Sequence, residues 1–225
     1  MKSLPAESRR VVREVGSACG LIPESAAKRT FDIVLAAIGL LVSAPIWVGV
    51  AAAIMLDDGE PVFFRQARWG RGGRRFMALK FRTMRSGSAS DRAIQAKAHD
   101  PRVTRVGRLL RASALDELPQ LWNILKGDMS FVGPRALPIN EVQTSGPDKN
   151  LPDEAVPGFR ERLAVRPGLT GIAQIFADRD IPRRHKFRLD LLYVKKHTFW
   201  LDLKLIALSF WITFRGKWED RGRKF

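Results

Sequence analysis

The sequence predicts an α/β protein, mostly helical and membrane-associated, on three observations. Residues 33–55 form an uncharged apolar run, residues 61–84 hold two β-prone segments around a glycine-rich turn, and later segments carry apolar residues at helical spacing. We therefore expect an N-terminal re-entrant membrane helix, a small β-hairpin and amphipathic interfacial helices. The expected division is a loosely ordered arm over residues 1–27, the membrane helix over 28–56, and a cytosolic domain over 57–225 that includes an interfacial C-terminal helix.

Composition and charge narrow the classes of partner. A chain of 225 residues fits one domain, and 45% apolar residues are enough for a hydrophobic core. The net charge of +16 and the pI near 11.0 require an anionic partner, and charge alone does not choose among nucleic acid, anionic lipid and a phosphorylated substrate. Cys19 is the only cysteine, which excludes an intramolecular disulfide and a cysteine cluster for zinc.

The apolar run from Ile33 to Met55 is long enough to cross a membrane. A straight helix through Leu56 would extend about 36 Å, against a hydrocarbon core of about 30 Å. Pro45 lies in the middle, however, and would kink the helix into two arms of about 18 Å, neither of which spans. We expect Ser43 to lie at the same bend. Lys28 and Arg29 precede the run, and Asp32 beside them is interpreted as their ion-pair partner at helical spacing.

Basic residues flank the apolar run on both sides. The positive-inside rule places such flanks on the same, cytoplasmic side of the membrane. A helix that enters one leaflet, bends at Pro45 and returns satisfies this rule, and a kinked helix that crosses the membrane is the alternative. A cleaved signal peptide is disfavoured by the length and position of the run. The cations that follow the run are Arg65, Arg68, Arg71, Arg74, Arg75 and Lys80.

A β-hairpin is expected from Pro61 to Met84. The runs VFFRQARW and RFMALKFRTM flank a GRGGR turn, and Lys80 falls in the second strand. The turn could contact RNA, although glycine here is also ordinary turn chemistry. Residues 86–99 are expected to form a polar loop or surface helix.

Two adjacent carboxylates, Asp116 and Glu117, stand where an amphipathic helix is expected to begin. Ser113 is a candidate cap, Pro119 suits a first turn, and Lys126-Gly127 marks the end of the helix. The apolar residues at helical spacing are Leu118, Leu121, Trp122 and Leu125.

Adjacent helical residues point about 100° apart, so this pair cannot flank a glycosidic bond as two facing carboxyls would. The two carboxylates therefore need different roles. One could attack phosphorus or hold a metal while the other shapes its protonation, and Arg111 and Arg135 would steady phosphate oxygens. Helix capping by acidic residues is the alternative.

The second half of the chain is expected to be loops and two helices. Residues 144–158 contain three prolines and predict an exposed loop, and RPGLTG (166–171) predicts a tight turn. A basic helix is expected over residues 182–197. The segment 197–218 is rich in Trp and Phe and is expected to lie at a membrane interface, because its uncharged part covers only about 15 Å; the core of a soluble protein is the alternative.

Taken together, these segments resemble one family. From Lys28 onward the chain is similar to the bacterial sugar transferases known as monotopic polyprenol-phosphate phosphoglycosyl transferases. The resemblance implies a membrane-associated enzyme on the cytoplasmic face of a bacterial inner membrane, with residues 57–225 as its catalytic domain. It rests on these segments, in chain order: KRTFD, PVFFRQ, KFRTM, LRASALDELPQLWNILKGDMSFVGPR, VRPGLTG and LDLLYVKKHTFWLDLK.

The resemblance also implies a reaction. A sugar 1-phosphate would move from a nucleoside diphosphate sugar, with uridine as the expected nucleoside, to polyprenol phosphate. The products would be nucleoside monophosphate and a polyprenyl diphosphosugar, which starts glycoconjugate or exopolysaccharide assembly. Mg²⁺ is the implied cofactor. The lipid bilayer is a further partner, no nucleic acid is expected, and a homo-oligomer is left open.

The family's functional residues fall on matching positions. Asp116 and Glu117 match the catalytic dyad, with Asp116 as the nucleophile that forms an aspartyl-phosphosugar. Lys80, Arg111 and Arg135 match basic active-site positions, and Asp202 matches a distant carboxylate expected to hold the metal with Asp116. Without the family context, the favoured interpretations are solvated surface charges for Lys80 and Arg111, a salt bridge for Arg135 and an interfacial helix cap for Asp202.

The chain departs from the family pattern at three places. Ala44 precedes Pro45 where the family usually has Ser, and Ser43 stands one position earlier; the bend is expected to persist. VGPR is followed by Ala136 rather than Pro. VRPGLTG continues as IAQIFADRD, where Arg179 is expected to substitute for the family's arginine. Because the last two changes lie where the nucleotide sugar is expected to bind, the identity of the sugar does not transfer.

Two other functions remain alternatives. One is a non-catalytic basic protein that binds nucleic acid or anionic lipid, whose affinity for nucleic acid would fall log-linearly with salt. The other is an enzyme that transfers the phosphosugar directly, without a covalent stage.

Overall fold

The computed structural model describes residues 20–85, 100–139, 151–177 and 181–215. The long helix α2 (Ala26–Asp58) comes first, and it is followed by β1 (Phe63–Trp69), the 3₁₀ turn η1 (Arg71–Gly73) and β2 (Arg75–Phe81). Next come α3 (Arg105–Ala112), η2 (Leu115–Glu117), α4 (Gln120–Lys126) and β3 (Ser130–Val132). The remaining elements are η3 (Asp153–Ala155), α5 (Phe159–Arg162), β4 (Gly168–Thr170), α6 (Ile172–Phe176), α7 (Arg183–Lys196) and α8 (Phe199–Phe214).

This part of the chain is mostly helical with two small sheets, as the sequence predicts. The expected arm lies largely outside the described residues, and the expected polar segment 86–99 lies wholly outside them.

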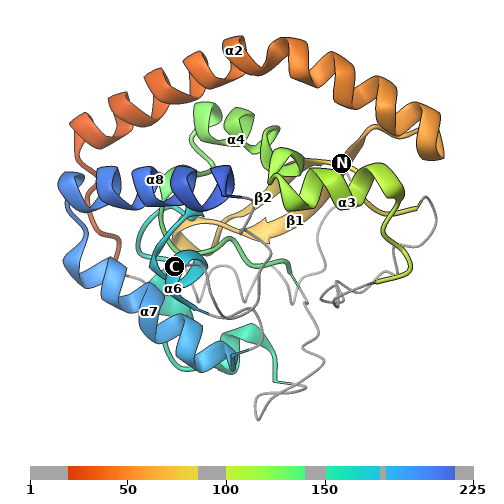
Figure 1. The fold of residues 1–225 in the computed structure, drawn as a ribbon. Helices are drawn as coiled ribbons and strands as arrows, with labels where there is room; N and C mark the ends of the chain where they lie inside the picture. The colour runs from red at the N-terminus through yellow and green to blue at the C-terminus, as the bar shows by residue number, and fades with distance from the viewer. Residues whose placement is uncertain (1–19, 86–99, 140–150, 178–180, 216–225) are drawn as a thin grey trace.

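Helix α2 passes over α4, α3 and the hairpin along one side of the molecule (Figure 1). On its inner side Ala36 belongs to the main core, and Ile54 packs with Phe81. Gly39 allows a close approach to α4, because a Cβ there would lie 3.0 Å from Cδ1 of Leu121. By length and composition α2 could cross a membrane, yet only 17% of its most apolar window is buried. That exposure favours contact with lipid over the core helix of a soluble protein.

The helix continues through Pro45 as one element. Pro45 has no N–H to donate to the carbonyl of the preceding turn, and Figure 1 shows α2 bowed rather than broken. The buried hydroxyl of Ser43 donates to the carbonyl of Leu40 at 3.4 Å and accepts from Nε1 of Trp47 at 3.1 Å. The predicted helix over residues 28–56 is confirmed, and a re-entrant path with a bend at Ser43 and Pro45 stays a prediction.

The predicted hairpin is confirmed. Strands β1 and β2 are antiparallel and pair Phe63 with Phe81 at one end and Trp69 with Arg75 at the other. Gly72 in the turn has a φ of 64°, which explains a glycine there. Arg71 of the same turn donates to the backbone carbonyls of Ile22 and Ala164. The turn therefore anchors the segment that precedes α2.

Two predictions for the second half are wrong. The expected turn at residues 166–171 contains strand β4, which runs parallel to β3 with Ser130 opposite Gly168. The strands lie so close that a Cβ on Gly168 would come within 2.1 Å of the Gly133 nitrogen, so glycine serves the pairing. The exposed loop expected to end at Gly158 is partly buried, since Asp153 lies inside and pairs with Arg183. Residues 144–150 of that loop lie outside the described residues.

The two C-terminal helices are confirmed. Helix α7 matches the expected basic helix and buries Phe187 and Tyr193. Helix α8 buries Asp202, Leu205 and Ile212 on one side. Its exposed aromatic residues are consistent with a membrane interface, which stays a prediction; they are Phe199, Trp200, Phe210, Trp211 and Phe214.

Candidate active site

The two adjacent carboxylates share a single lysine. Nζ of Lys80, on β2, lies 3.4 Å from Oδ2 of Asp116 and forms a shorter ion pair with Oε1 of Glu117. All three side chains are at least four-fifths buried. The structure thus brings together the predicted dyad and one of its predicted cations, and the cluster holds one more negative charge than this lysine neutralises.

The backbone before the dyad turns sharply. Helix α3 ends at Ala112, and Ala114 adopts the left-handed conformation with a φ of 56°, which costs an alanine on the order of 1 kcal/mol. The dyad then lies on the 3₁₀ turn η2, before α4, rather than in the first turn of a regular helix. Ser113 does not cap this turn, because its hydroxyl donates to the Leu109 carbonyl at the end of α3.

Asn123 fixes the strand of Lys80 against the helix that follows the dyad. Its Oδ1 accepts from the Leu79 nitrogen at 3.0 Å, and its Nδ2 donates to the Met77 carbonyl at 2.8 Å. This buried amide therefore hydrogen-bonds the edge of β2 as a neighbouring strand would. Trp122, expected to pack with the apolar face of α4, is instead half exposed.

The dyad's two carboxyl groups have opposite pKa shifts. Burial raises the pKa of Asp116 above its usual 3.8, and the charge of Glu117 adds to this, while Lys80 and Arg111 only partly oppose it. Burial acts in the same direction on Glu117, but Lys80 and then Arg135 outweigh it and lower its pKa to about 2. Glu117 is therefore firmly ionised, and Asp116 is the more basic carboxylate of the pair.

The other cations divide between the two carboxylates. Arg111 lies on the Asp116 side and donates from Nε to Oγ1 of Thr83 at 2.9 Å. The exposed Arg135 acts on Glu117 together with Arg68. Arg68 is buried on β1 and donates to the Ala136 carbonyl, and the sequence prediction missed this role. Its only sequence signal is a cation among the apolar residues of a strand. Arg179 lies outside the described residues.

A buried ion pair supports Arg135. Nη2 of Arg162 donates to the Arg135 carbonyl at 2.6 Å and to Oδ2 of Asp190 at 2.7 Å, and Asp190 also receives a backbone hydrogen bond from Arg135. Both side chains are almost fully buried. This pair was not predicted as part of the site, because its partners are 28 residues apart and act on backbone atoms.

Asp202 lies in a different cluster. Its Oδ2 pairs with Nζ of Lys28 at 2.5 Å, and its Oδ1 accepts from the Tyr193 hydroxyl at 2.7 Å. Within the described residues, no three His, Cys, Asp or Glu side chains are close enough to hold a metal. Mg²⁺ commonly uses only one or two carboxylates together with substrate phosphates, so Asp116 and Glu117 fit it as donors. Asp202 as a second metal ligand stays a prediction.

Comparison with known proteins connects this site to a family. A model described as "Bacterial sugar transferase" matches residues 23–216. The chain belongs to the bacterial sugar transferase family. The match includes the dyad, Lys80, Arg111, Arg135 and Asp202, as well as the whole of α2 and α8.

Relatives of this sugar transferase carry related names. One from Klebsiella pneumoniae, "UDP-glucose:undecaprenyl-phosphate glucose-1-phosphate transferase", is 40% identical over 84% of this chain and 40% of its own length. "Exopolysaccharide production protein PSS" of Rhizobium leguminosarum bv. phaseoli is 40% identical over 80% of this chain and 90% of its own. One from Aeromonas hydrophila, named as a UDP-N-acetylgalactosamine-undecaprenyl-phosphate N-acetylgalactosaminephosphotransferase, is 39% identical over 80% of this chain and 41% of its own. This chain thus spans well under half of two of these relatives.

Proposed function

We propose that this sugar transferase moves a sugar 1-phosphate from a uridine diphosphate sugar to a polyprenol phosphate such as undecaprenyl phosphate. The relatives' names supply both substrate classes and the link to exopolysaccharide production. The observation that carries the proposal is the buried dyad around Lys80, in which one carboxylate is made more basic and the other is held ionised. Paired groups with divergent pKa values are typical of groups with separate chemical roles.

The pKa shifts favour Asp116 as the nucleophile. A more basic carboxylate donates its electron pair more readily, whereas Glu117, with a pKa of about 2, is a weak base suited to holding a cation. Of the two carboxylate oxygens of Asp116, Lys80 bonds Oδ2. Oδ1 is therefore the oxygen that we assign to attack on phosphorus.

The reaction then has two balanced displacements. In the first, Asp116 forms a bond to the β-phosphorus of the donor while the bond to the bridging oxygen breaks, and uridine monophosphate leaves with that electron pair. In the second, an oxygen of polyprenol phosphate attacks the same phosphorus and the aspartyl ester breaks, which restores the carboxylate. Arg111, Arg135 and Lys80 would stabilise the negative charge on phosphate oxygens in both steps.

Magnesium is the proposed cofactor. Asp116 and Glu117 would hold it together with the donor's phosphate oxygens. When bound, it supplies neutralisation of charge on the transferring phosphoryl group.

The contacts of α2 support a monotopic arrangement on the cytoplasmic face of a bacterial inner membrane. Near its start, Lys28 pairs with Asp202, and at its end Arg82 donates to the carbonyls of Asp58 and Gly59. Because both ends contact the same body, a straight crossing would leave that body on both sides of the bilayer. A helix that enters and leaves one leaflet, with basic residues on both flanks, avoids this cost.

The proposal is tested by offering the full-length protein in micelles a set of UDP-sugars with Mg²⁺ and undecaprenyl phosphate. We expect uridine monophosphate release with the matching donor, ping-pong kinetics, and a phosphosugar adduct on Asp116 in protein quenched without acceptor. Ternary-complex kinetics with no adduct would instead indicate direct transfer. If none of the donors gave uridine monophosphate and the protein bound RNA with a steep dependence on salt, the non-catalytic alternative would be supported.

A further inference from the structure

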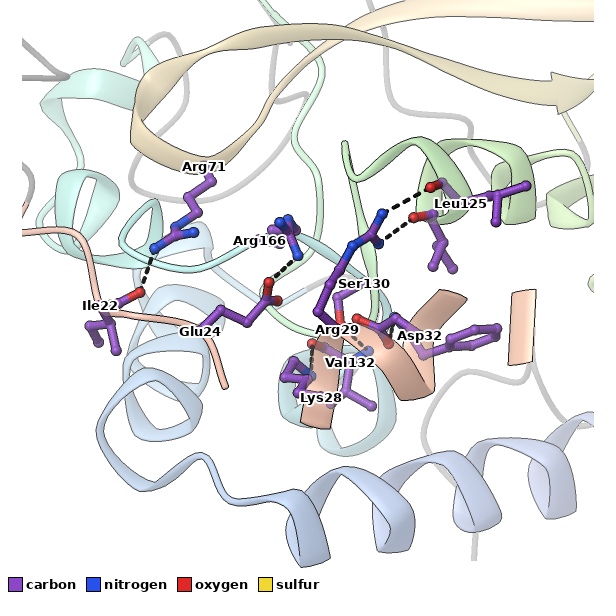
Figure 2. A network of polar contacts seen from close by, with 12 residues as sticks. Ile22, Glu24, Lys28, Arg29, Asp32, Arg71, Leu125, Ser130, Val132 and Arg166 are labelled. Carbon is purple, nitrogen blue, oxygen red and sulfur yellow. Dashed lines mark hydrogen bonds and ion pairs between the residues drawn. The ribbon is translucent and has the colours of Figure 1, made fainter. Parts of the chain in front are cut away.

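Three charged residues in the first two turns of α2 point into the body and bond to α4 and β3 (Figure 2). We call Lys28, Arg29 and Asp32 the polar seam. They belong to the KRTFD segment, to which the reaction itself assigns no role. Helical spacing favours an interpretation of Asp32 as the ion-pair partner of the two cations. That interpretation is wrong, because each member of the seam bonds to a distant segment instead.

Arg29 holds the end of α4. Its Nη1 donates to the Ile124 carbonyl at 2.7 Å and its Nη2 to the Leu125 carbonyl at 2.9 Å. These carbonyls lie in the last turn of the helix, where the helix dipole favours a cation, and the Ile124 carbonyl also accepts from the Gly127 nitrogen at 3.0 Å. The guanidinium fork fits two adjacent carbonyls, which a lysine ammonium cannot reproduce.

Asp32 and Lys28 hold strand β3. Oδ1 of Asp32 accepts from the Phe131 nitrogen at 3.2 Å, and Nζ of Lys28 donates to the Val132 carbonyl at 3.3 Å. Asp32 is 1% exposed. A residue that served only to attract lipid headgroups would face solvent, so this burial argues for an internal role.

The two elements held by the seam lead directly to the active site. Helix α4 begins three residues after Glu117, and Asn123 within it bonds the strand of Lys80. Strand β3 ends three residues before Arg135. The seam is thus the place where the membrane helix contacts both the dyad side and the Arg135 side of the site.

We propose that the polar seam of α2 positions the dyad and Arg135 relative to one another, so that the membrane helix forms part of the catalytic scaffold as well as the anchor. This inference rests on the proposed function. Lys28, Arg29 and Asp32 are positioning residues, since none touches the reacting groups. A shift of about 1 Å between such groups lowers a rate by about 10²-fold, so small losses at the seam are measurable.

The test uses Arg29→Lys, which keeps the charge and removes the fork. We would measure single-turnover release of uridine monophosphate by the full chain in micelles, with UDP-glucose and no lipid acceptor, so that membrane delivery of the acceptor does not enter. We expect the rate constant to fall by about tenfold while the burst amplitude is kept. The matched control is Lys204→Gln, which removes an exposed cation on α8 and should leave both quantities unchanged.

Each other outcome decides against the inference. An unchanged rate constant in Arg29→Lys would mean that only the charge matters. A lower amplitude at an unchanged rate constant would mean that the seam only stabilises the fold.

A second readout separates this inference from the proposed function. Hydrogen exchange of residues 120–132 should increase in Arg29→Lys while α7 keeps its protection, whether or not UDP-glucose is the true donor. Unchanged exchange there would overturn the positioning role. Absence of nucleotide release from wild-type protein with every donor would count against the proposed function alone.

Discussion

Two lysine–carboxylate clusters in this protein contain similar residues but differ in their bonding. Around Lys28, one ammonium meets one carboxylate, and each oxygen of Asp202 is bonded, one to Lys28 and the other to Tyr193. Around Lys80, one ammonium meets two carboxylates, and further cations act from Arg111 and Arg135. The first cluster pairs one ammonium with one carboxylate whose two oxygens are both bonded, and in the second three cations act on two carboxylates, with Arg135 exposed.

This difference separates a structural ion pair from a reactive one. A buried pair with complete hydrogen bonding holds segments together, and its loss exposes an uncompensated charge in the interior. A cluster in which two adjacent carboxylates share one lysine and have opposite pKa shifts keeps capacity for a substrate or a metal. We therefore assign chemistry to the Lys80 cluster and assembly of α2, α7 and α8 to the Lys28 cluster.

The largest expected effect is that of Asp116→Asn in the Lys80 cluster, and Asp202→Asn makes the same change in the Lys28 cluster. Asp116→Asn should lower turnover by about 10⁴-fold or more and abolish the phosphosugar adduct, because the proposed nucleophile is lost. Its fold and membrane association should be retained, since Glu117 still pairs with Lys80. Nucleotide release and mass spectrometry of quenched protein measure these outcomes.

Asp202→Asn is the matched variant. It should lower the free energy of unfolding by about 3 kcal/mol, because Lys28 loses its buried counter-charge. Thermal unfolding in micelles measures this, and folded protein should keep the proposed requirement for Mg²⁺. A variant that is as stable as wild type but needs far more Mg²⁺ would show that Asp202 is a metal ligand and would remove the distinction between the clusters.

The sequence predicted the reactive cluster better than the structural one. The hairpin and the position of the dyad could be found because their turn residues and periodicity have local causes, and the role of Lys80 was implied by the family resemblance. The contact of Lys28 with Asp202 joins residues 174 positions apart, so no local pattern reveals it. The β3–β4 pairing was missed for a similar reason, since each strand has three residues and the pairing depends on close glycine contacts.

An effect of intermediate size is expected for Glu117→Gln, and its pH dependence tests the coupling between the two carboxylates of the Lys80 cluster. The charge of Glu117 raises the pKa of Asp116, so removing it should lower that pKa, and Lys80 would then act on Asp116 alone. Since the proposed attack requires an ionised Asp116, the acid limb of kcat/KM should move to lower pH in the variant. The rate on the plateau should fall by about 10²-fold through loss of the second carboxylate.

This experiment compares full pH–rate profiles of wild type and variant with one donor. An acid limb that stays in place would show that Asp116 does not control it. A limb that moves to higher pH would contradict the direction of the coupling.

The smallest effect at neutral pH concerns Tyr193, the only tyrosine in the chain. Burial, and then the charge of Asp202, raise the pKa of its hydroxyl well above the usual 10.0, so the folded protein holds this proton more tightly than the unfolded chain. The resulting stabilisation is fully present below pH 10 and declines as the pH rises further. Tyrosinate absorbance should therefore appear only together with alkaline unfolding, whereas a free phenol would titrate near pH 10 in the native state.

Tyr193→Phe should lower the free energy of unfolding by about 1–3 kcal/mol, because Oδ1 of Asp202 loses its donor. The variant should retain the nucleotide-release rate constant within about twofold. Native-state ionisation of Tyr193 near pH 10 would mean that the Lys28 cluster is open to solvent, and its assignment as a buried structural cluster would then fail.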